Sequence, residues 1–332
     1  MNAALIGTRR GAVHARWLTA APGFTVVGVA HDRDERTAAA LAARHPGAQV
    51  TSDALSLVKR QDVDLVVVAV PPTACEEVVA LALRRGVRVV CEMPLATDRD
   101  TALRLAELAA ESGAPAHASF QWRCNEALRQ ARSRVLGGEV GEVVAVDITL
   151  YDDSHLGPGT RWPWRQRAGA GGALLELGTH ALDLVRWTTA VPVWDVGSAW
   201  THRLHDTRRG PHGPVPVEVD DVAQVELRAY ARDTRARVMV SRVDPERRLT
   251  AVFTGSRGVL EVRVDGADGS GVVTLRTGSR SVSRVTGPDD MNPYPRLVPD
   301  TALDGVATFD DALAALTSAH AALAVAAPVS GA

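Results

Sequence analysis

Apolar and polar positions alternate along the first 120 residues in a pattern that predicts strands and helices in turn. Short apolar runs predict strands at residues 3–6, 25–30, 63–70, 87–91 and 116–120. Segments with helical spacing separate them, at residues 12–20, 35–44, 76–85 and 98–112. The run at 63–70 is apolar throughout, as expected of a strand covered on both faces. This alternation predicts an α/β domain built on a doubly wound parallel sheet.

The pattern changes near residue 122. Helical spacing recurs at residues 125–136 and 171–187, and a last helix is predicted at 310–326. Strands are predicted at residues 143–150, 193–200, 217–227, 236–243, 250–253, 259–264 and 272–277, with loops at 203–215 and 287–299. Such a run predicts a second α/β domain with a large, mainly antiparallel open sheet. We therefore divide the chain into a first domain over residues 1–121 and a second over 122–332.

Composition narrows the classes of partner. The chain has 332 residues, enough for two domains, and a formal net charge of -2. We therefore expect neither nucleic acid nor a membrane as partner. The three cysteines (Cys75, Cys91 and Cys124) form no CxxC pair, which argues against disulfides and structural zinc. With no signal-peptide pattern at the start and no apolar run of about 20 residues, a cytoplasmic location is expected.

A glycine-flanked loop follows the first predicted strand. It reads Gly7-Thr8-Arg9-Arg10-Gly11, one residue shorter than the dinucleotide fingerprint G-x-G-x-x-G, with Arg9 about where the second glycine would stand. Gly7 suits a tight turn, Gly11 suits close packing, and the amides that open the next helix suit a phosphate. Arg9 or Arg10 would add a charge-assisted contact. The loop alone fits a dinucleotide site and a plain turn about equally.

The end of the second predicted strand bears on the choice of coenzyme. It is followed by His31-Asp32-Arg33, about 20 residues after the glycine loop. Asp32 favours the ribose hydroxyls of NAD, whereas His31 and Arg33 favour the 2′-phosphate of NADP. NAD and NADP both stay open, with a lean to NADP.

Later motifs carry a family resemblance. They are Val70-Pro71-Pro72, Cys91-Glu92-Met93-Pro94-Leu95, Trp164-Arg165, and the run from Gly171-Gly172 through Glu176 and His180 to Asp183. In order and spacing they resemble the glucose-fructose oxidoreductase and inositol dehydrogenase family, Gfo/Idh/MocA. The resemblance implies a Rossmann domain and an open-sheet domain with the active site between them. It also implies hydride transfer with nicotinamide C4, often on sugars or cyclitols, in homodimers or homotetramers. Val70, Pro71, Glu92, Met93 and Pro94 would join the coenzyme site.

One departure from the family changes the expected chemistry. Typical members carry Glu-Lys-Pro where this chain has Glu92-Met93-Pro94, and methionine cannot exchange a proton as that lysine does. The only lysine of the chain, Lys59, is expected at the opposite end of the sheet. Biliverdin reductases and thiazolinyl imine reductases, two related branches, also lack this lysine, and the short glycine loop looks like that of the imine reductases. Reduction of a C=N or C=C bond therefore stands beside dehydrogenation of a sugar or cyclitol.

Acid–base work would then fall to other residues. Glu176 and His180 are four residues apart on a predicted helix, share one face, and match the family's aspartate and histidine positions. His180 is the candidate for proton transfer, against the alternative of a purely structural histidine, and Asp183 is a structural partner. Tyr151, at a strand end, is a further candidate proton donor.

Substrate contacts are expected from aromatic and basic residues. The candidates are Trp122, Arg123, Trp162, Trp164 and Arg165, with core packing or a subunit contact as the alternative for the tryptophans. Metal-ligand spacing is absent, so no metal is expected. Two other classes stay open on the same scaffold: a non-redox enzyme for cyclisation, elimination or hydrolysis, and a non-catalytic binding protein.

Overall fold

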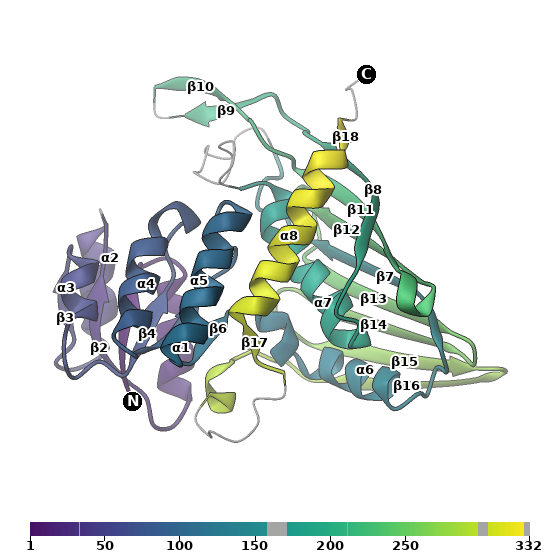
Figure 1. The fold of residues 1–332 in the computed structure, drawn as a ribbon, viewed down its shortest axis with the longest axis horizontal. Coiled ribbons are helices and arrows are strands. Elements are labelled where there is room, and N and C mark those ends of the chain that lie inside the picture. Colours follow the sequence, from purple (N-terminus) through teal and green to yellow (C-terminus); the bar gives the residue numbers. More distant parts are fainter. Residues whose placement is uncertain (33, 158–170, 211, 298–304, 329–332) are drawn as a thin grey trace. The chain divides into compact units, whose positions relative to one another are not determined.

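Two compact units make up the chain in the computed structural model, shown as a ribbon in Figure 1. The first contains Met1–Phe120 and Asn292–Leu313, and the second contains Gln121–Met291 and Ala314–Ala332. The structure describes residues 1–32, 34–157, 171–210, 212–297 and 305–328. No helix in this described part is long and apolar enough to cross a bilayer.

A seven-stranded sheet forms the centre of the first unit. Its order is β17-β6-β5-β4-β1-β2-β3, with every neighbouring pair parallel except β17 and β6. The strands are β1 (Asn2–Ile6), β2 (Thr25–Ala30), β3 (Gln49–Thr51), β4 (Leu65–Val68), β5 (Arg88–Cys91), β6 (Ala116–Ala118) and β17 (Ala307–Thr308). The helices are α1 (Gly11–Ala20), α2 (Glu35–Ala42), α3 (Ala54–Val58), α4 (Glu76–Arg84) and α5 (Arg99–Ser112). The order reverses between β1 and β4, and ligands bind such sheets at the carboxyl ends of the strands at this point.

The apolar content of the strands explains their places in this sheet. All four residues of β4 are fully buried, because β4 is a central strand with both faces covered. Side-chain caps mark where helices begin: the Asp34 carboxylate accepts a hydrogen bond from the Thr37 N–H, and Asp98 does the same for Thr101.

A nine-stranded sheet forms the second unit. Its order is β16-β15-β14-β13-β7-β12-β11-β8-β18, and only the pairs β7–β12 and β8–β18 are parallel. The strands are β7 (Val143–Tyr151), β8 (Asp195–His202), β11 (Val222–Ala229), β12 (Thr234–Ser241), β13 (Arg248–Gly255), β14 (Val259–Asp265), β15 (Gly271–Thr277), β16 (Arg280–Thr286) and β18 (Ala327–Pro328). The helical segments are α6 (Glu126–Leu136), the π-helical turn η4 (Leu174–Gly178), α7 (Thr179–Thr189) and α8 (Phe309–Val325), within which the chain passes from the first unit to the second.

Alternation along the strands shows which face of this sheet is covered. Ala236, Val238 and Val240 of β12 are buried under the helices, while Arg235 and Arg237 point to the other face. α6 and α7 pack on the covered face, in view in Figure 1. The predicted fold class, a doubly wound parallel sheet followed by a large, mainly antiparallel open sheet, is confirmed.

The division of the chain differs from a single cut at residue 121. After the second unit the chain returns to the first over Asn292–Leu313, where β17 adds to the edge of the sheet beside β6. Tyr294 and Leu297 join the core around β1 and α1. A two-residue strand and one buried tyrosine leave no periodic pattern, so the sequence assigned this segment to the second domain.

Two further predictions need correction. The predicted loop at 203–215 contains a hairpin of β9 (Thr207–Gly210) and β10 (Gly213–Pro216), whose antiparallel pairing relies on backbone hydrogen bonds rather than apolar side chains. The strand β16 was not predicted at all. Six of its seven residues are exposed, so it lacks the apolar alternation by which strands are recognised.

His117 on β6 should make the stability of the first unit depend on pH. Its side chain is 5% exposed, and burial, followed by the charge of Arg88, lowers the pKa of His117 from 6.5 to about 4. The folded state therefore favours the neutral ring, so this contribution to stability is complete above pH 6.5 and is lost as the pH falls through 4, by about 3 kcal/mol in all.

We expect His117→Leu to lose less unfolding free energy than the parent protein between pH 7 and pH 4.5. Urea unfolding at several pH values measures this difference. Identical pH dependence in the two proteins would contradict the assignment.

Candidate functional site

The turn after β1 can be formed only by glycine. Gly7 has a φ of +103°, and a Cβ there would lie 2.5 Å from the carbonyl oxygen of Ala69, at the end of β4. The Gly7 N–H donates to the Ala30 carbonyl at 2.9 Å, which ties the turn to the end of β2. The loop thus lies where three neighbouring parallel strands end.

The helix that follows this turn begins without an anion of its own. α1 has neither a side-chain cap nor an acidic residue in its first turn. Arg10 occupies the N-cap position, and the Arg9 side chain is exposed. A Cβ at Gly11 would meet no heavy atom within 4 Å, so the close packing expected of Gly11 is not found. The positive end of the helix is therefore left for a bound anion.

A buried polar cluster surrounds Glu92, directly after β5. Its Oε1 accepts hydrogen bonds from Arg10 Nη2 at 3.0 Å, His14 Nε2 at 2.7 Å and Ser119 Oγ at 3.2 Å. Burial alone would raise the pKa of Glu92, but the His14 hydrogen bond and the charge of Arg10 together hold it far below its usual value. Arg10, expected to contact a phosphate, binds Glu92 instead.

Other predicted coenzyme contacts lie at the same ends of the parallel strands. Val70 and Pro71, after β4, are half-buried, as is Met93, whose peptide bond to Pro94 is cis. After β2, His31 is half-buried and Asp32 is exposed, while Arg33 lies outside the described residues. Thr8 is half-buried, and its carbonyl accepts the N–H of Ala12.

In the second unit, Glu176 occupies a π-helical turn, a feature frequent at functional sites. Its Oε2 accepts a hydrogen bond from Arg242 Nη2 at 2.7 Å, and both side chains are 8% exposed. Arg242 Nη1 also reaches Asp152 at 3.1 Å and Ser154 at 3.0 Å. Sequence reasoning missed Arg242, because nothing in the local pattern after β12 marks it as the partner of a residue 66 positions earlier.

Asp220 holds the start of this π-helical turn. Asp220 Oδ2 accepts the N–H of Leu174 at 2.8 Å, and burial raises the pKa of Asp220 to about 6. Gly172, at φ +106°, is required here, since a Cβ would lie 2.3 Å from Asp220 Oδ1. The neighbouring Asp221 accepts the backbone N–H of Leu204 and lies 3.2 Å from His155 Nδ1.

The helix that carries His180 also carries Asp183, which forms a buried ion pair with Arg123. His180, in the first turn of α7, is 8% exposed. Asp183, in the next turn, receives Arg123 Nε at 2.7 Å and a second bond from Arg123 Nη2, with both side chains buried. This bidentate pair gives Asp183 a structural role and engages the guanidinium of Arg123, a predicted substrate contact.

The remaining predicted residues are not gathered around Glu176. Tyr151 points to the face of the sheet opposite Leu150, where the guanidinium of Arg248 lies 4.9 Å from its ring, and burial raises the pKa of Tyr151. Trp122 is 8% exposed. Trp162, Trp164 and Arg165 lie outside the described residues.

Two other features limit the chemistry. Lys59 is exposed at the end of α3, before β4, and therefore at the amino ends of the parallel strands, away from Glu92. Across the described ranges, no three His, Cys, Asp or Glu side chains form a group that could hold a metal ion.

Two family models match this sequence. Residues 1–120 match the oxidoreductase family with an NAD-binding Rossmann fold, GFO_IDH_MocA, and residues 128–261 match a Gfo/Idh/MocA C-terminal domain. Among curated relatives, inositol 2-dehydrogenase 2 of Saccharopolyspora erythraea is 32% identical over 56% of this chain and 53% of its own length. Levoglucosan dehydrogenase of Pseudarthrobacter phenanthrenivorans is 27% identical over 63% of this chain and 57% of its own length. The chain thus spans just over half the length of these relatives.

Solved structures share the fold over nearly the whole chain. A levoglucosan dehydrogenase in complex with NADH and L-sorbose superposes with a TM-score of 0.83 at 20% identity, covering 98% of this chain and 96% of its own. A 3-ketoreductase of Actinomadura kijaniata in complex with NADP and TDP-benzene superposes with a TM-score of 0.80 at 22% identity, covering 99% and 98%.

Removing Arg242 should break two ion pairs, one with the buried Glu176 and one with the half-buried Asp152. We expect Arg242→Met to lower the unfolding free energy by about 3 kcal/mol, since Glu176 and Asp152 would lose their shared partner. Adding Glu176→Gln to Arg242→Met should cost less than Glu176→Gln alone costs the parent, because the ion pair with Arg242 is already absent. Urea unfolding of the single and double variants measures these effects, and losses that simply add would refute the coupling.

Proposed function

Since the chain belongs to the Gfo/Idh/MocA family of NAD-binding Rossmann-fold oxidoreductases, we propose that it transfers hydride between a nicotinamide coenzyme and a small-molecule substrate. The observation that carries the proposal is the uncapped start of α1 behind the Gly7 turn. A helix that begins with no side-chain cap and no acidic residue in its first turn is suited to a diphosphate, because the positive end of its dipole lies there. This favours an NAD(P)-dependent enzyme over a non-redox enzyme or a non-catalytic binding protein.

The first unit supplies the coenzyme contacts in this proposal. Bound there, the nicotinamide supplies hydride chemistry at C4. The glycine loop up to Gly11 and the positive end of α1 would hold the diphosphate, and the loop after β2 would hold the adenosine ribose. Glu92, held as an anion, would accept a hydrogen bond from a ligand hydroxyl. The exposed Asp32 and the adjacent His31 do not discriminate between the coenzymes, and we retain the lean to NADP from the pair His31 and Arg33.

The second unit supplies the acid–base groups. Met93 cannot transfer a proton, so we assign that step to His180, the histidine at the family position. Glu176 lies one turn before it and is fixed in place by Arg242, which suits a carboxylate that orients a neighbouring group. Tyr151 lies on the other face of the sheet and takes no part in this proposal.

For the substrate, the relatives favour a polyhydroxylated sugar or cyclitol, by the names of the inositol and levoglucosan dehydrogenases. Met93 supports a second candidate, reduction of a C=N or C=C bond. An imine can carry the proton itself, so such a reduction does not need the lysine. Product analysis with cyclitols and NAD⁺ or NADP⁺, and with cyclic imines and NADH or NADPH, separates the two.

Gly11 offers a sharp test of coenzyme binding. We expect Gly11→Asp to keep or raise thermal stability, because an acid in the first turn suits the helix dipole and a Cβ there meets open space. The same carboxylate should weaken NADH and NADPH binding roughly tenfold or more by repelling the diphosphate. Gly11→Ala is the uncharged control and should bind within about twofold of the parent. Equal affinity in all three proteins, measured by isothermal titration calorimetry, would argue against a diphosphate at α1.

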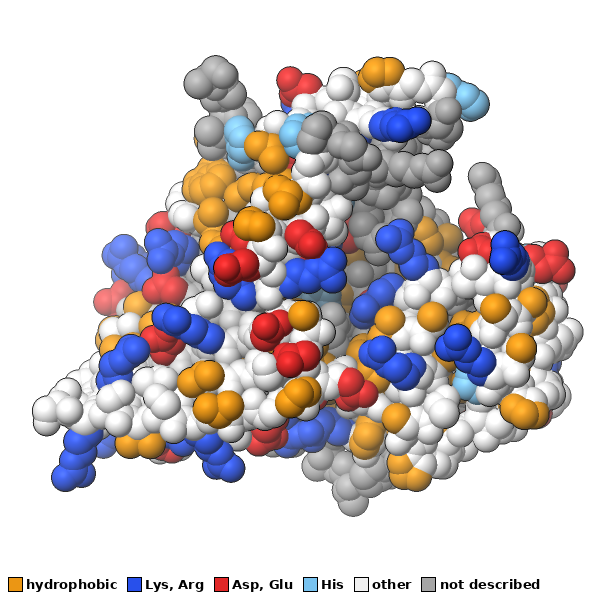
Figure 2. Space-filling model, turned by 180° about the vertical axis from the view of Figure 1, so that it is seen from behind, with side chains coloured by type: hydrophobic (Ala, Val, Ile, Leu, Met, Phe, Trp, Pro, Cys, Tyr) orange, Lys and Arg blue, Asp and Glu red, His pale blue; other side chains and the backbone are white. Residues whose placement is uncertain are grey.

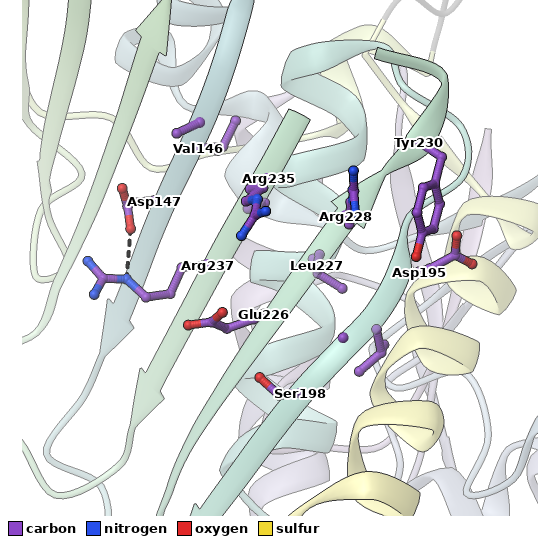
Figure 3. Close-up of a pocket in the computed structure, with 14 residues that line it drawn as sticks. Val146, Asp147, Asp195, Ser198, Glu226, Leu227, Arg228, Tyr230, Arg235 and Arg237 are labelled. Carbon is purple, nitrogen blue, oxygen red and sulfur yellow. Dashed lines mark hydrogen bonds and ion pairs between the residues drawn. The ribbon is translucent and has the colours of Figure 1, made fainter. Parts of the chain in front are cut away.

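We also propose a homodimer or homotetramer that uses the uncovered face of the nine-stranded sheet. That face carries a pocket of about 440 Å³. Figure 3 shows the charged side chains that line it, Arg228, Arg235 and Arg237 together with Asp147 and Glu226. Such mixed charges can pair with a second copy of the same surface. On the face shown in Figure 2, basic and acidic side chains are likewise interspersed, which supports the expectation that nucleic acid is not a partner.

Val285 tests this assembly. It is 74% exposed on β16 and pairs across the strands with Val272, an exposed apolar residue of β15. Light scattering should give a mass of two or four chains of 35.2 kDa each for the parent, and a smaller mass for Val285→Glu. Val193→Glu, 66% exposed before β8, is the control and should leave the mass unchanged. A parent protein that runs as a monomer would rule out the assembly.

A further inference from the structure

A buried chain of hydrogen bonds runs behind Glu92. His14 Nε2 lies 2.7 Å from Glu92 Oε1, and His14 Nδ1 lies 2.7 Å from the Tyr294 hydroxyl. The side chains of His14 and Tyr294 are both fully buried. The three groups come from α1, the end of β5 and the segment that returns to this unit after residue 291.

The chemistry of the three groups determines which of them donates and which accepts in each hydrogen bond. An ionised carboxylate can only accept, so the hydrogen between His14 and Glu92 belongs to His14 Nε2. In the neutral ring Nδ1 is then an acceptor, and the Tyr294 hydroxyl is its donor. Burial, with the nearby charge of Glu92, raises the pKa of Tyr294 well above its usual value, so the hydroxyl keeps its hydrogen.

Tyr294 is itself held firmly. Its backbone N–H donates to Asn292 Oδ1 at 2.9 Å, and Asn292 Nδ2 donates to the Trp17 carbonyl on α1 at 2.9 Å. The ring packs edge-on against Phe24 and His14. The orientation of the His14 ring is therefore set by the returning segment and not by α1 alone.

The hydrogen bonds to Glu92 all go to one of its two carboxylate oxygens. Oε1 accepts all three hydrogen bonds described above, from Arg10, His14 and Ser119. Within the described residues, Oε2 accepts none, and the Glu92 side chain is 11% exposed. An oriented carboxylate with one saturated oxygen presents the other to a ligand that donates a hydrogen bond.

We infer that His14 and Tyr294 are positioning residues that hold Glu92 so that Oε2 binds a hydroxyl of the nicotinamide ribose. The inference rests on the proposed function, since it needs a nicotinamide coenzyme on the first unit. His14 touches no ligand in this account and acts through Glu92. Tyr294 acts through His14, from a position 280 residues further along the chain.

Two kinds of ligand, reduced coenzyme and ADP, distinguish a positioning role of His14 and Tyr294 from a general structural role. NADH and NADPH contain the nicotinamide ribose, whereas ADP contains only the adenosine diphosphate part. Loss of the oriented carboxylate should weaken the first kind of ligand and spare ADP. General damage to the nucleotide loop should weaken both.

The experiment compares three variants by calorimetric titration with ADP and with whichever reduced coenzyme the parent binds more tightly. We expect His14→Leu to weaken coenzyme binding roughly tenfold, the value of one charge-assisted hydrogen bond, with ADP within about twofold. His14→Gln keeps an amide donor for Glu92 and should recover most of that affinity. Tyr294→Phe removes only the hydroxyl and should give a loss between these two.

A matched control and an epistasis test complete the design. His117→Leu replaces another buried histidine of the same unit that does not touch Glu92, and its coenzyme affinity should match the parent. Adding His14→Leu to Glu92→Gln should weaken binding no further than Glu92→Gln alone.

The outcomes separate the inference from the proposed function. A parent protein that binds neither NADH nor NADPH at millimolar concentration overturns both. A parent that binds, with His14→Leu and Tyr294→Phe unchanged or with coenzyme and ADP weakened equally, overturns the positioning role alone. Should His14→Leu not fold, Tyr294→Phe and His14→Gln still decide the question by the same comparison.

Discussion

A carboxylate buried at the end of a parallel strand must be surrounded by hydrogen-bond donors, and much of the first unit is arranged around this requirement of Glu92. Its donors come from α1 and from the residue after β6, and the segment that returns after residue 291 supports one of them, His14. An unpaired charge in that position would cost several kcal/mol. The cluster therefore couples the nucleotide loop, the Glu92-Met93-Pro94 turn and the late segment into one arrangement.

The second unit also contains a buried charged group, in this case the cation of Arg242, that must be surrounded by partners of opposite charge. Arg242 is buried between the carboxylates of Glu176 and Asp152, and the neighbouring Asp220 secures the π-helical turn that carries Glu176. Because Gly172 leaves room for the Asp220 carboxylate, glycine at this position has a steric reason as well as a conformational one. Both units thus place a fixed carboxylate on a short, specially shaped segment, and the proposed chemistry uses both.

Methionine at position 93 determines which groups can transfer a proton in the proposed enzyme. In the proposed mechanism, methionine at this position and Lys59 at the amino ends of the strands leave proton transfer to the second unit, where a histidine and a carboxylate lie one turn apart. Arg10 brings a positive charge to Glu92 in a turn that has no lysine. Proton transfer by groups of the second unit is consistent with a hydroxylated substrate and also with an imine that carries its own proton.

The sequence by itself determined the two kinds of sheet, most of the helices and the place of the nucleotide loop, because apolar periodicity and the glycine at position 7 are local signals. It also singled out Glu92, Glu176 and His180 through motifs of short span. Tertiary structure alone decided that Arg10 turns to Glu92, that Arg242 holds Glu176 and that Tyr294 supports His14, since each of these contacts joins residues at least 66 positions apart. The edge strand β16 and the β9–β10 hairpin were likewise decided by backbone pairing, which leaves little trace in the pattern of side chains.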